Sequence, residues 1–309
     1  MKRIFFVVNP NAAAGRARKH FLKAWRAVSK EFPATTYRYT TGAGDATRIV
    51  RQALAEGFDT IVVVGGDGTN NEALNGFMNE EGGVRNPYAV LGFYPSGTGG
   101  DLRRVLRLPE TPEALIRYLR DDRRKKIDCG LAQFISHEGR KTSRYFLNIL
   151  SFGLSGLVVH IVNTSSKVLG GRLSFLIGTL RALFQYRDLE ARILIDKEVV
   201  YEGPLRLAAI ANGRFFGGGM MVAPEAQLDD GLFDVVVFEK MGLLEFLRLS
   251  NTIYSGRHIT HPKIHLFRGR TVSVSGPYSL WIDLDGEDPG TTPLHVRLIA
   301  QCVNVLELV

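Results

Sequence analysis

The segment Ile61-Val62-Val63-Val64-Gly65-Gly66-Asp67-Gly68-Thr69-Asn70-Asn71-Glu72 decides the fold of the first part of the chain. Its four β-branched apolar residues predict a buried strand, and the three glycines around Asp67 predict a turn that only glycine tolerates. Residues 70–78 are expected to continue as a helix, because Ala73, Leu74 and Phe77 are spaced for one buried face. A strand, a glycine-rich turn and a helix N-terminus in this order favour phosphate binding, since backbone N–H groups and the helix dipole both attract anions.

The aspartate in this turn narrows the choice of ligand. Neither common phosphate fingerprint fits, because the chain has no G-x-x-x-x-G-K-[ST] and Gly66-x-Gly68 lacks the third glycine of G-x-G-x-x-G. Asp67 would repel a phosphate unless a cation lay between them. The segment therefore predicts binding of a Mg²⁺–nucleotide rather than of a bare phosphate.

Length and composition limit the class of protein. At 309 residues the chain exceeds a typical single domain, so we expect two. The net charge of +8 favours a polyanionic partner: a nucleotide, a nucleic acid or an anionic membrane. Two cysteines argue against a disulfide framework and indicate a reducing compartment. Because no stretch reaches the ~18 apolar residues of a membrane span, we expect any membrane contact to be peripheral.

Strands and helices alternate over the first 120 residues. The expected strands are residues 3–8, 35–39, 61–64 and 88–94, and the expected helices include residues 16–30, 70–78 and 112–120 and one that begins at Asp45. This alternation predicts a parallel sheet covered on both faces, with ligands at the carboxyl ends of the strands. The loops that follow the first, third and fourth strands should therefore converge.

The pattern changes after residue 125 to many short strands with few helices, which predicts an antiparallel sandwich or barrel. We place the boundary near residues 126–128, with domains at 1–127 and 128–300, and leave open whether the last strand, residues 302–306, returns to the first domain. A helix over residues 173–184 carries an apolar stripe. It fits a membrane-surface helix or the lid of a lipid site, but an ordinary helix packed on the sheet is about twice as likely from the pattern alone.

Two acidic positions outside the opening segment are candidates for binding a cation. Asp101 ends a second glycine-rich loop, Gly97-Thr98-Gly99-Gly100-Asp101. By itself it would be interpreted as a helix N-cap, but together with Asp67 on a neighbouring strand end it can hold Mg²⁺ for phosphoryl transfer. Asp230 precedes an expected strand at residues 233–239, and it belongs either to a turn or to an oxygen-ligand cation site.

A third acidic segment lies near the end of the chain, where four acids surround one tight turn in Asp283-Leu284-Asp285-Gly286-Glu287-Asp288. Asp-Gly is a common hairpin signal, so the turn is either merely solvated or carries a general base for a hydroxyl group.

Motifs of other enzymes are missing: there is no G-x-S-x-G, H-E-x-x-H or C-x-x-C. The spacing of His258, His261 and His265 is metal-like, but Pro262 breaks any shared helix face, and we assign them no role.

In these motifs the chain resembles the diacylglycerol kinase catalytic family, soluble bacterial lipid kinases related to sphingosine and ceramide kinases. The resemblance spans nearly the whole chain. It rests on five segments in order: residues 65–72, 95–101, 211–220, 228–234 and 285–287. The first motif is shared with NAD kinases, whereas the ordered set is specific.

The resemblance implies an ATP-dependent lipid kinase with an N-terminal α/β nucleotide domain, similar to phosphofructokinase and NAD kinase, and a C-terminal antiparallel β-sandwich lipid domain. It implies an ATP site lined by Asn9, Thr40, Gly66, Asp67, Gly68, Thr69, Asn70, Asn71, Glu72 and Thr98. It further implies that Asp67 and Asp101 organise a catalytic Mg²⁺ and that Glu287 accepts the proton of the lipid hydroxyl. A separate structural Mg²⁺ would be held by Gln227, Asp230 and Leu232.

One departure from the family concerns Gly99-Gly100-Asp101, where the family usually has Gly-Asn-Asp, so an amide side chain beside the Mg²⁺ site is lost. We predict transfer of the γ-phosphoryl group of ATP to the hydroxyl of a membrane lipid such as diacylglycerol. The enzyme is expected to be cytoplasmic and peripheral at the anionic inner membrane face, with no nucleic acid partner.

The alternatives are an NAD-kinase-like enzyme acting on a soluble metabolite, or a non-catalytic lipid-binding regulator. Left open are the acceptor lipid, the choice between Glu287 and Asp67 as base, and the oligomeric state, which includes a homodimer.

Overall fold

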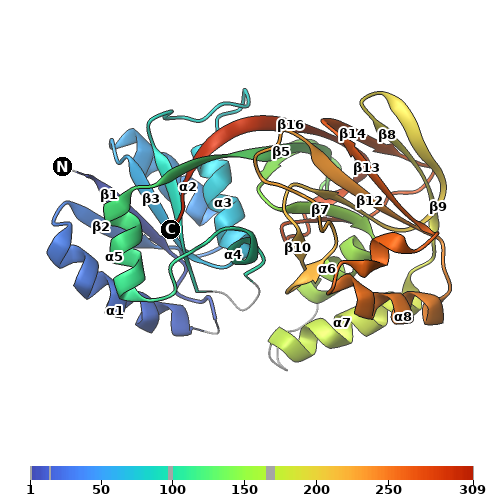
Figure 1. Cartoon of the computed structure of the whole chain (residues 1–309), viewed down its shortest axis with the longest axis horizontal. Helices are drawn as coiled ribbons and strands as arrows, with labels where there is room; N and C mark the ends of the chain where they lie inside the picture. Colours follow the sequence, from blue (N-terminus) through green and yellow to red (C-terminus); the bar gives the residue numbers. More distant parts are fainter. Residues whose placement is uncertain (1, 14, 97–99, 165–170, 309) are drawn as a thin grey trace. The chain divides into compact units, whose positions relative to one another are not determined.

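The structure is a computed structural model that describes residues 2–13, 15–96, 100–164 and 171–308, with only the backbone at residues 171–176. The chain forms two compact units (Figure 1). Unit 1 comprises Met1–Cys129 and Ile299–Val309, and unit 2 comprises Gly130–Leu298. The sequence places the boundary at residues 127/128, two residues before this division. The difference arises because one strand, β5 (Arg124–Ser136), continues without a break from unit 1 into unit 2.

Unit 1 contains a parallel sheet with the strand order β16-β4-β3-β1-β2, in which only the C-terminal part of β16 takes part. Helices α1 and α5 pack together, and α2 packs with α3 (Figure 1). The elements are β1 (Ile4–Val8), α1 (Arg16–Glu31), β2 (Thr35–Tyr39), α2 (Asp45–Ala55), β3 (Thr60–Gly65), α3 (Asp67–Phe77), β4 (Val90–Pro95), α4 (Leu102–Val105), α5 (Pro112–Asp121) and β16 (Gly290–Leu306).

Alternation of side chains along the strands explains the two helical layers. Ile4, Phe6 and Val8 of β1 share a buried cluster with residues of α1 and α5. Phe5 and Val7 point to the opposite face of the sheet and are buried as well. A sheet buried on both faces requires continuous apolar runs in its strands, which is what the sequence of β1 and β3 provides. The predicted α/β fold class is confirmed.

The end of the chain returns to unit 1. Val305 pairs in parallel with Leu91 of β4. The buried Tyr118 hydroxyl joins the neighbouring elements, because it accepts a hydrogen bond from Phe93 N (3.1 Å) and donates one to Leu306 O (3.0 Å). Burial raises the pKa of Tyr118, so its hydroxyl keeps the proton that it donates.

Unit 2 is an antiparallel β-sandwich, as predicted. One sheet has the order β13-β12-β9-β7-β15 and the other β9-β8-β14-β16-β5-β6, with the long strand β9 in both. The elements are β6 (Lys141–Phe146), β7 (Ile149–Gly153), α6 (Leu154–Thr164), α7 (Gly171–Gln185), β8 (Leu189–Ile195), β9 (Glu198–Ala211), β10 (Phe215–Phe216), β11 (Met220–Met221), β12 (Phe233–Glu239), α8 (Leu243–Ile253), β13 (Ile264–Gly269), β14 (Thr271–Ser275) and β15 (Ile282–Leu284).

Two apolar clusters hold unit 2 together. One lies between the two sheets and includes Phe146, Phe152 and Val235. The other lies between the β9–β12 face and the helices α6, α7 and α8. The sequence pattern of residues 144–150 predicts one strand, and this prediction is wrong. The segment is broken between β6 and β7, because the N–H groups of Leu147 and Asn148 point to the Asp285 carboxylate instead of a neighbouring strand.

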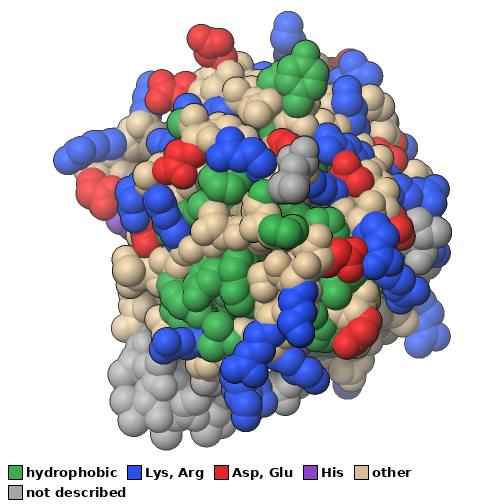
Figure 2. Space-filling view, turned by 90° about the vertical axis from the view of Figure 1, so that its left-hand side faces the viewer, with side chains coloured by type: hydrophobic (Ala, Val, Ile, Leu, Met, Phe, Trp, Pro, Cys, Tyr) green, Lys and Arg blue, Asp and Glu red, His purple; other side chains and the backbone are tan. Residues whose placement is uncertain are grey.

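The surface carries the positive charge in a dispersed form. Lys and Arg side chains are distributed over much of the face shown in Figure 2, with acidic side chains between them. Among the residues that the structure describes, no helix is both long enough and apolar enough to cross a membrane.

Candidate active site

The glycine-rich segment of unit 1 differs in detail from the predicted turn. Helix α3 begins at Asp67, three residues earlier than expected, so Gly68 and Thr69 belong to its first turn. Gly66 is extended (φ −106°, ψ −172°), a conformation open to other residues. Gly65 is needed for close approach instead, because a Cβ there would lie 2.7 Å from Cβ of Thr69. The glycines thus let the helix start directly against the strand end.

Asp67 connects this helix to the second glycine-rich loop. Its Oδ2 accepts hydrogen bonds from the backbone N–H of Gly100 (3.1 Å) and of Asp101 (3.2 Å). As the first residue of α3, Asp67 also lies where the helix dipole favours negative charge. The predicted meeting of the loops after β3 and β4 is therefore present, and Asp67 itself makes the connection.

Asn9 brings the loop after β1 into the same place. Its Nδ2 donates to Thr69 Oγ1 (3.0 Å), and its backbone N–H donates to Val64 O at the end of β3 (2.9 Å). In the strand order β4-β3-β1-β2, the connections leave β1 and β3 in opposite directions. The crevice at the carboxyl ends of such a pair is the usual ligand position in a doubly wound sheet. Asn9 and Thr69 lie at this switch point.

The remaining residues of the predicted nucleotide site have different surroundings. Thr40 follows β2 at the same sheet edge, is buried, and donates its N–H to Val8 O (2.9 Å). Asn70 and Asn71 are buried in the first turns of α3. The Glu72 carboxylate accepts from Gly44 N (2.8 Å) and from N of Ala46 (3.1 Å), so it holds the N-terminus of α2. Thr98 lies outside the described residues.

Asp101 sits at the start of the short helix α4 without capping it through its side chain. The carboxylate is buried, and its Oδ1 lies 3.6 Å from Arg104 Nε. Gly100 has φ +68°, the left-handed region that both glycine and asparagine adopt readily. The glycine found in place of the family's asparagine therefore preserves the backbone conformation. Both Asp67 and Asp101 carry carboxylate oxygens, the type of ligand that Mg²⁺ prefers.

In unit 2 the acidic turn is built around Asp285. Its carboxylate accepts three backbone N–H groups, from Leu147 (3.0 Å), Asn148 (3.1 Å) and Ile149 (3.0 Å). Asp285 and Gly286 both have positive φ, +51° and +87°, as a tight hairpin turn requires. The segment is thus anchored to the connection between β6 and β7, more than 130 residues earlier in the chain.

The Asp283 carboxylate also holds the backbone of this turn. Its Oδ1 accepts from Gly286 N (2.8 Å), and its Oδ2 lies 3.3 Å from Ser151 Oγ. Burial, above all, raises the pKa of Asp283 to about 7. Glu287 closes the turn, because its N–H donates to Leu284 O (3.0 Å) and its O accepts from Leu284 N (2.9 Å). The side chain of Glu287 is half-buried at the tip of a rigidly held turn.

The predicted second cation site contains a feature that the sequence did not indicate. Asp230 Oδ1 accepts from Leu232 N (3.1 Å), while its Oδ2 pairs closely with the Arg268 guanidinium. The neighbouring Asp234 is fully buried, and neither of its carboxylate oxygens makes a hydrogen bond within the described part of the chain. Burial raises the pKa of Asp234 to about 6. Such oxygens fit a cation, although Arg268 already supplies positive charge there. Gln227 is exposed in the preceding loop.

The three histidines that received no role do not gather. His258 is buried and bonds to Val222 O (3.0 Å), His261 pairs with Glu245, and the His265 ring contacts the Glu239 carboxylate (2.7 Å). Sequence reasoning missed His137 and His160 instead. Both approach Asp288, from positions 151 and 128 residues away, and no local motif links them.

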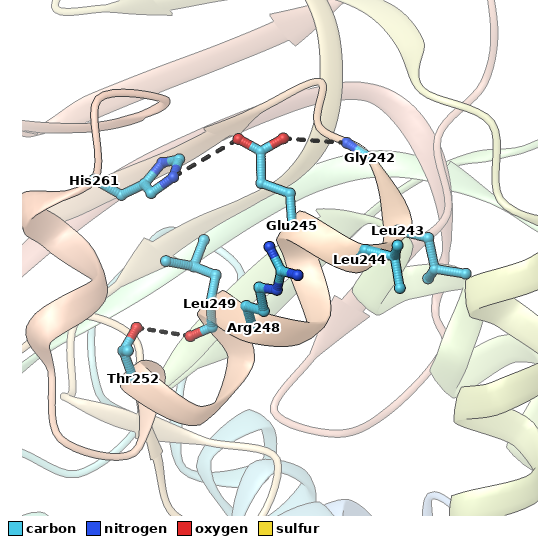
Figure 3. A pocket seen from close by; sticks show the side chains of 8 residues that line it. All are labelled: Gly242, Leu243, Leu244, Glu245, Arg248, Leu249, Thr252 and His261. Atoms are coloured by element: carbon cyan, nitrogen blue, oxygen red, sulfur yellow. Dashed lines mark hydrogen bonds and ion pairs between the residues drawn. The ribbon is translucent and has the colours of Figure 1, made fainter.

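An open groove of unit 2 runs along helix α8 (Figure 3). Leu243, Leu244 and Leu249 supply its apolar lining, and Arg248 lies beside them. The Glu245 carboxylate accepts a hydrogen bond from the backbone N–H of Gly242 (3.3 Å), which caps the N-terminus of the helix. The residues that line this groove, taken from the described part of the chain, include none of the predicted catalytic or metal-binding residues.

Two family models match the chain. Residues 3–132 match the diacylglycerol kinase catalytic domain, and residues 148–307 match the YegS C-terminal NAD kinase beta sandwich-like domain. The first match ends at residue 132, three residues after the chain leaves unit 1 at Cys129. The second match ends at residue 307, so besides most of unit 2 it includes part of the C-terminal segment that belongs to unit 1.

Curated relatives match over nearly the full length. A diacylglycerol kinase from Bacillus subtilis is 29% identical over 296 residues, covering 95% of this chain and 92% of that protein. One from Staphylococcus saprophyticus is 27% identical over 304 residues, covering 98% and 95%.

Solved structures share the fold. A candidate diacylglycerol kinase from Bacillus anthracis aligns over 100% of this chain and 97% of its own, with 24% identity and a TM-score of 0.79. Yeast NADH kinase in complex with NADH aligns over 98% and 82%, with 11% identity and a TM-score of 0.57.

Proposed function

Because the chain belongs to the diacylglycerol kinase catalytic family, we propose that it transfers the γ-phosphoryl group of ATP to the hydroxyl of a membrane lipid such as diacylglycerol. The enzyme is a lipid kinase, a phosphotransferase with an alcohol group as acceptor. The single observation that carries the proposal is the meeting of three loops at the carboxyl ends of β1, β3 and β4, where Asp67 holds the backbone of Asp101.

We propose that the nucleotide binds at this meeting point. Asn9, Thr40 and Thr98 and the segment from Gly66 to Asn71 would line the ATP site, with the α3 N-terminus facing the phosphates. Glu72 would contribute indirectly, by holding the first turn of α2. Asp67 and Asp101 would hold Mg²⁺, which when bound neutralises charge on the phosphates. Exclusion of water and in-line positioning would be the protein's main contributions.

We assign the general base to Glu287 rather than to Asp67. The Asp67 oxygen that accepts two backbone N–H groups is committed to holding the second loop in place. Around Glu287, by contrast, Asp283 and Asp285 both hold backbone groups of the turn, so the turn presents Glu287 at a defined position. A base must reach the hydroxyl proton within hydrogen-bond distance, and a rigid turn favours this.

A second Mg²⁺ would have a structural role in unit 2. Gln227 and Leu232 would offer carbonyl oxygens and Asp230 a carboxylate. The buried Asp234 carboxylate is nearby in sequence, and its Oδ1 lies 3.5 Å from Arg268 Nε. Arg268 competes for Asp230. We therefore expect Mg²⁺ to raise the melting temperature of the Arg268→Met variant more than that of the original chain. Equal Mg²⁺ effects on both would argue against this site.

We propose membrane contact through α7 and α8, which both contribute residues to the same apolar cluster of unit 2. Phe184 of α7 is 77% exposed and Leu244 of α8 is 71% exposed, and Arg181 and Arg248 are exposed on the same two helices. Exposed apolar side chains with arginines beside them fit the headgroup region of an anionic bilayer. On the face shown in Figure 2, positive and negative side chains are intermixed.

Vesicle sedimentation tests this contact. Phe184→Glu and Leu244→Glu should each weaken binding to vesicles that contain phosphatidylglycerol, and added salt should weaken it further. Val199→Glu, at an exposed apolar position in the β8–β9 hairpin, is the matched control and should bind normally. Binding that is unchanged in both test variants would remove α7 and α8 from the contact.

The activity is tested by incubating the protein with labelled ATP, Mg²⁺ and a total lipid extract, followed by mass spectrometry of the phosphorylated lipids. A phosphomonoester of diacylglycerol is the expected product. Label on NAD, offered in a parallel reaction, would identify an NAD-kinase-like enzyme instead. Absence of transfer by folded protein to either acceptor would favour a non-catalytic lipid-binding regulator.

A further inference from the structure

We propose that His137, His160 and Asp288 form a binding site for a divalent transition-metal ion of the Zn²⁺ class. The three residues come from separate elements: the turn between β5 and β6, helix α6, and the segment after β15. Their potential ligand atoms all lie within 4.8 Å of one another. Among the described residues this is the one group of three histidine, cysteine or acidic side chains so arranged.

The distances between the two histidine rings and the Asp288 carboxylate are close to those between neighbouring ligand atoms of a metal ion. His160 Nδ1 is 2.8 Å from Asp288 Oδ2, and His137 Nε2 is 3.1 Å from Asp288 Oδ1. In a tetrahedral zinc site with bonds of about 2.0–2.2 Å, neighbouring ligand atoms are roughly 3.3 Å apart. Small side-chain movements would therefore make room for the ion between the carboxylate and the two rings.

The burial of Asp288 points to a cation as well. Its side chain is only 6% exposed, and Oδ1 accepts no hydrogen bond from any described residue, despite the nearby His137 ring. A buried carboxylate oxygen without a hydrogen bond is costly, and a bound cation would satisfy it. The His137 side chain is 40% exposed, so solvent can reach the site from that side.

Trp281 keeps the His160 ring in place. The two rings are stacked with centroids 3.6 Å apart and an interplanar angle of 18°. The His137 ring lies 5.6 Å from the same tryptophan. A ligand that is held in orientation before the metal arrives loses less freedom on binding, so this stacking favours the site.

The ligand types select the metal. Two imidazoles and one carboxylate suit Zn²⁺, Co²⁺ or Ni²⁺, whereas Mg²⁺ prefers oxygen ligands alone. The site would therefore discriminate against the Mg²⁺ of phosphoryl transfer. Three protein ligands leave a fourth position for water. Because Asp288 directly follows Glu287, the ion would also tie the turn to α6; any effect on transfer rests on the proposed function, whereas metal binding does not.

Cobalt titration of the full chain tests the proposal. The chain has two tryptophans, so Trp25→Phe leaves Trp281 as the reporter. One equivalent of Co²⁺ should quench its fluorescence and produce a visible d–d absorption band, and Zn²⁺ but not excess Mg²⁺ should displace it. In the same background, His160→Ala and Asp288→Asn should each weaken Co²⁺ binding at least about tenfold.

The controls use the histidines that pair with one glutamate each. His261→Ala and His265→Ala should leave Co²⁺ binding unchanged, and circular dichroism checks that every variant is folded. Asp288→Asn preserves the shape of the side chain, so it remains informative if His160→Ala disturbs α6. Co²⁺ binding that is absent, or equal in all variants, would overturn the site. Neither result depends on ATP or lipid, so the lipid kinase proposal stands or falls separately.

Discussion

Two aspartates, one in each unit, each hold a distant loop by accepting hydrogen bonds from its backbone N–H groups. Asp67 in unit 1 accepts backbone N–H groups from residues 33 and 34 positions away, across neighbouring strand ends. Asp285 in unit 2 accepts three N–H groups from residues 136 to 138 positions away. Each carboxylate fixes a loop that carries a second acid, Asp101 or Glu287. The difference is that the partners of Asp67 follow from the order of strands, while those of Asp285 depend on how a sandwich closes.

In both units, the residue that holds the backbone differs from the group proposed to take part in the reaction. In both regions an aspartate holds the backbone, and the proposed chemistry belongs to a neighbouring acid or to a cation. Substitutions should therefore divide into those that stop transfer with little effect on stability and those that destabilise the unit.

The largest effect is expected for Glu287→Gln. Loss of a positioned base typically slows a reaction by about 10²- to 10⁴-fold, so labelled-ATP transfer to lipid should fall by that factor. The melting temperature should stay close to that of the original chain, because glutamine keeps the shape of the side chain and the backbone hydrogen bonds that close the turn. Glu202→Gln, an exposed acid of β9, is the control. Retained transfer would reassign the base to Asp67.

The next largest effect is expected on stability, when either of the two aspartates that hold loops is replaced by alanine. Asp285→Ala leaves three backbone N–H groups without their acceptor, at about 1–3 kcal/mol each, so a loss of about 3 kcal/mol or more is expected. Asp67→Ala leaves two, and its loss should be smaller. Urea unfolding measures both, with transfer activity assayed alongside. A larger loss for Asp67→Ala would contradict the assignment of Asp285 as the stronger anchor.

Asp283 is expected to make a smaller contribution to stability, one that depends on pH. Because its pKa is raised from 3.8 to about 7, the folded state binds this proton more tightly than the unfolded state, and stability falls as pH rises from about 4 to 7. The slope contributed is at most about 1.4 kcal/mol per pH unit. Asp283→Asn should remove it, so the variant gains stability relative to the original chain toward pH 7. Parallel pH profiles from thermal melts would disprove this.

The smallest effect should follow from Gly100→Asn, which restores the residue usual in the family. At φ +68° asparagine is tolerated, and the nearest atoms belong to the flexible Arg103 side chain, so stability should change by less than about 1 kcal/mol. Gly100→Val should cost more, since β-branched residues avoid this region. Matched transfer rates for the Gly and Asn forms would show that the departure is neutral; a large loss in Gly100→Asn would show that the side chain matters.

Much of unit 1 was predictable because its signals are local. The apolar run of β3, the glycines and Asp67 are contiguous, and strand order then brings Asn9 and the second loop to the same edge. The start of α3 was predicted three residues late, because the glycines suggested a turn where close packing of Thr69 on Gly65 allows the helix to begin at once. Glu72 was predicted for the nucleotide site, yet its carboxylate holds α2, a tertiary contact that no periodicity reveals.

The sequence by itself determined the α/β unit, the β-rich unit and the family, because strand and helix periods and ordered motifs are properties of neighbouring residues. Only the tertiary structure decided that Asp285 anchors the turn of Glu287, that Asp234 is buried without hydrogen bonds, and that His137 and His160 meet Asp288. These relations join residues from distant parts of the chain, and an antiparallel sandwich brings them together through its packing. No local sequence pattern indicates such contacts, so these three became visible only in the fold.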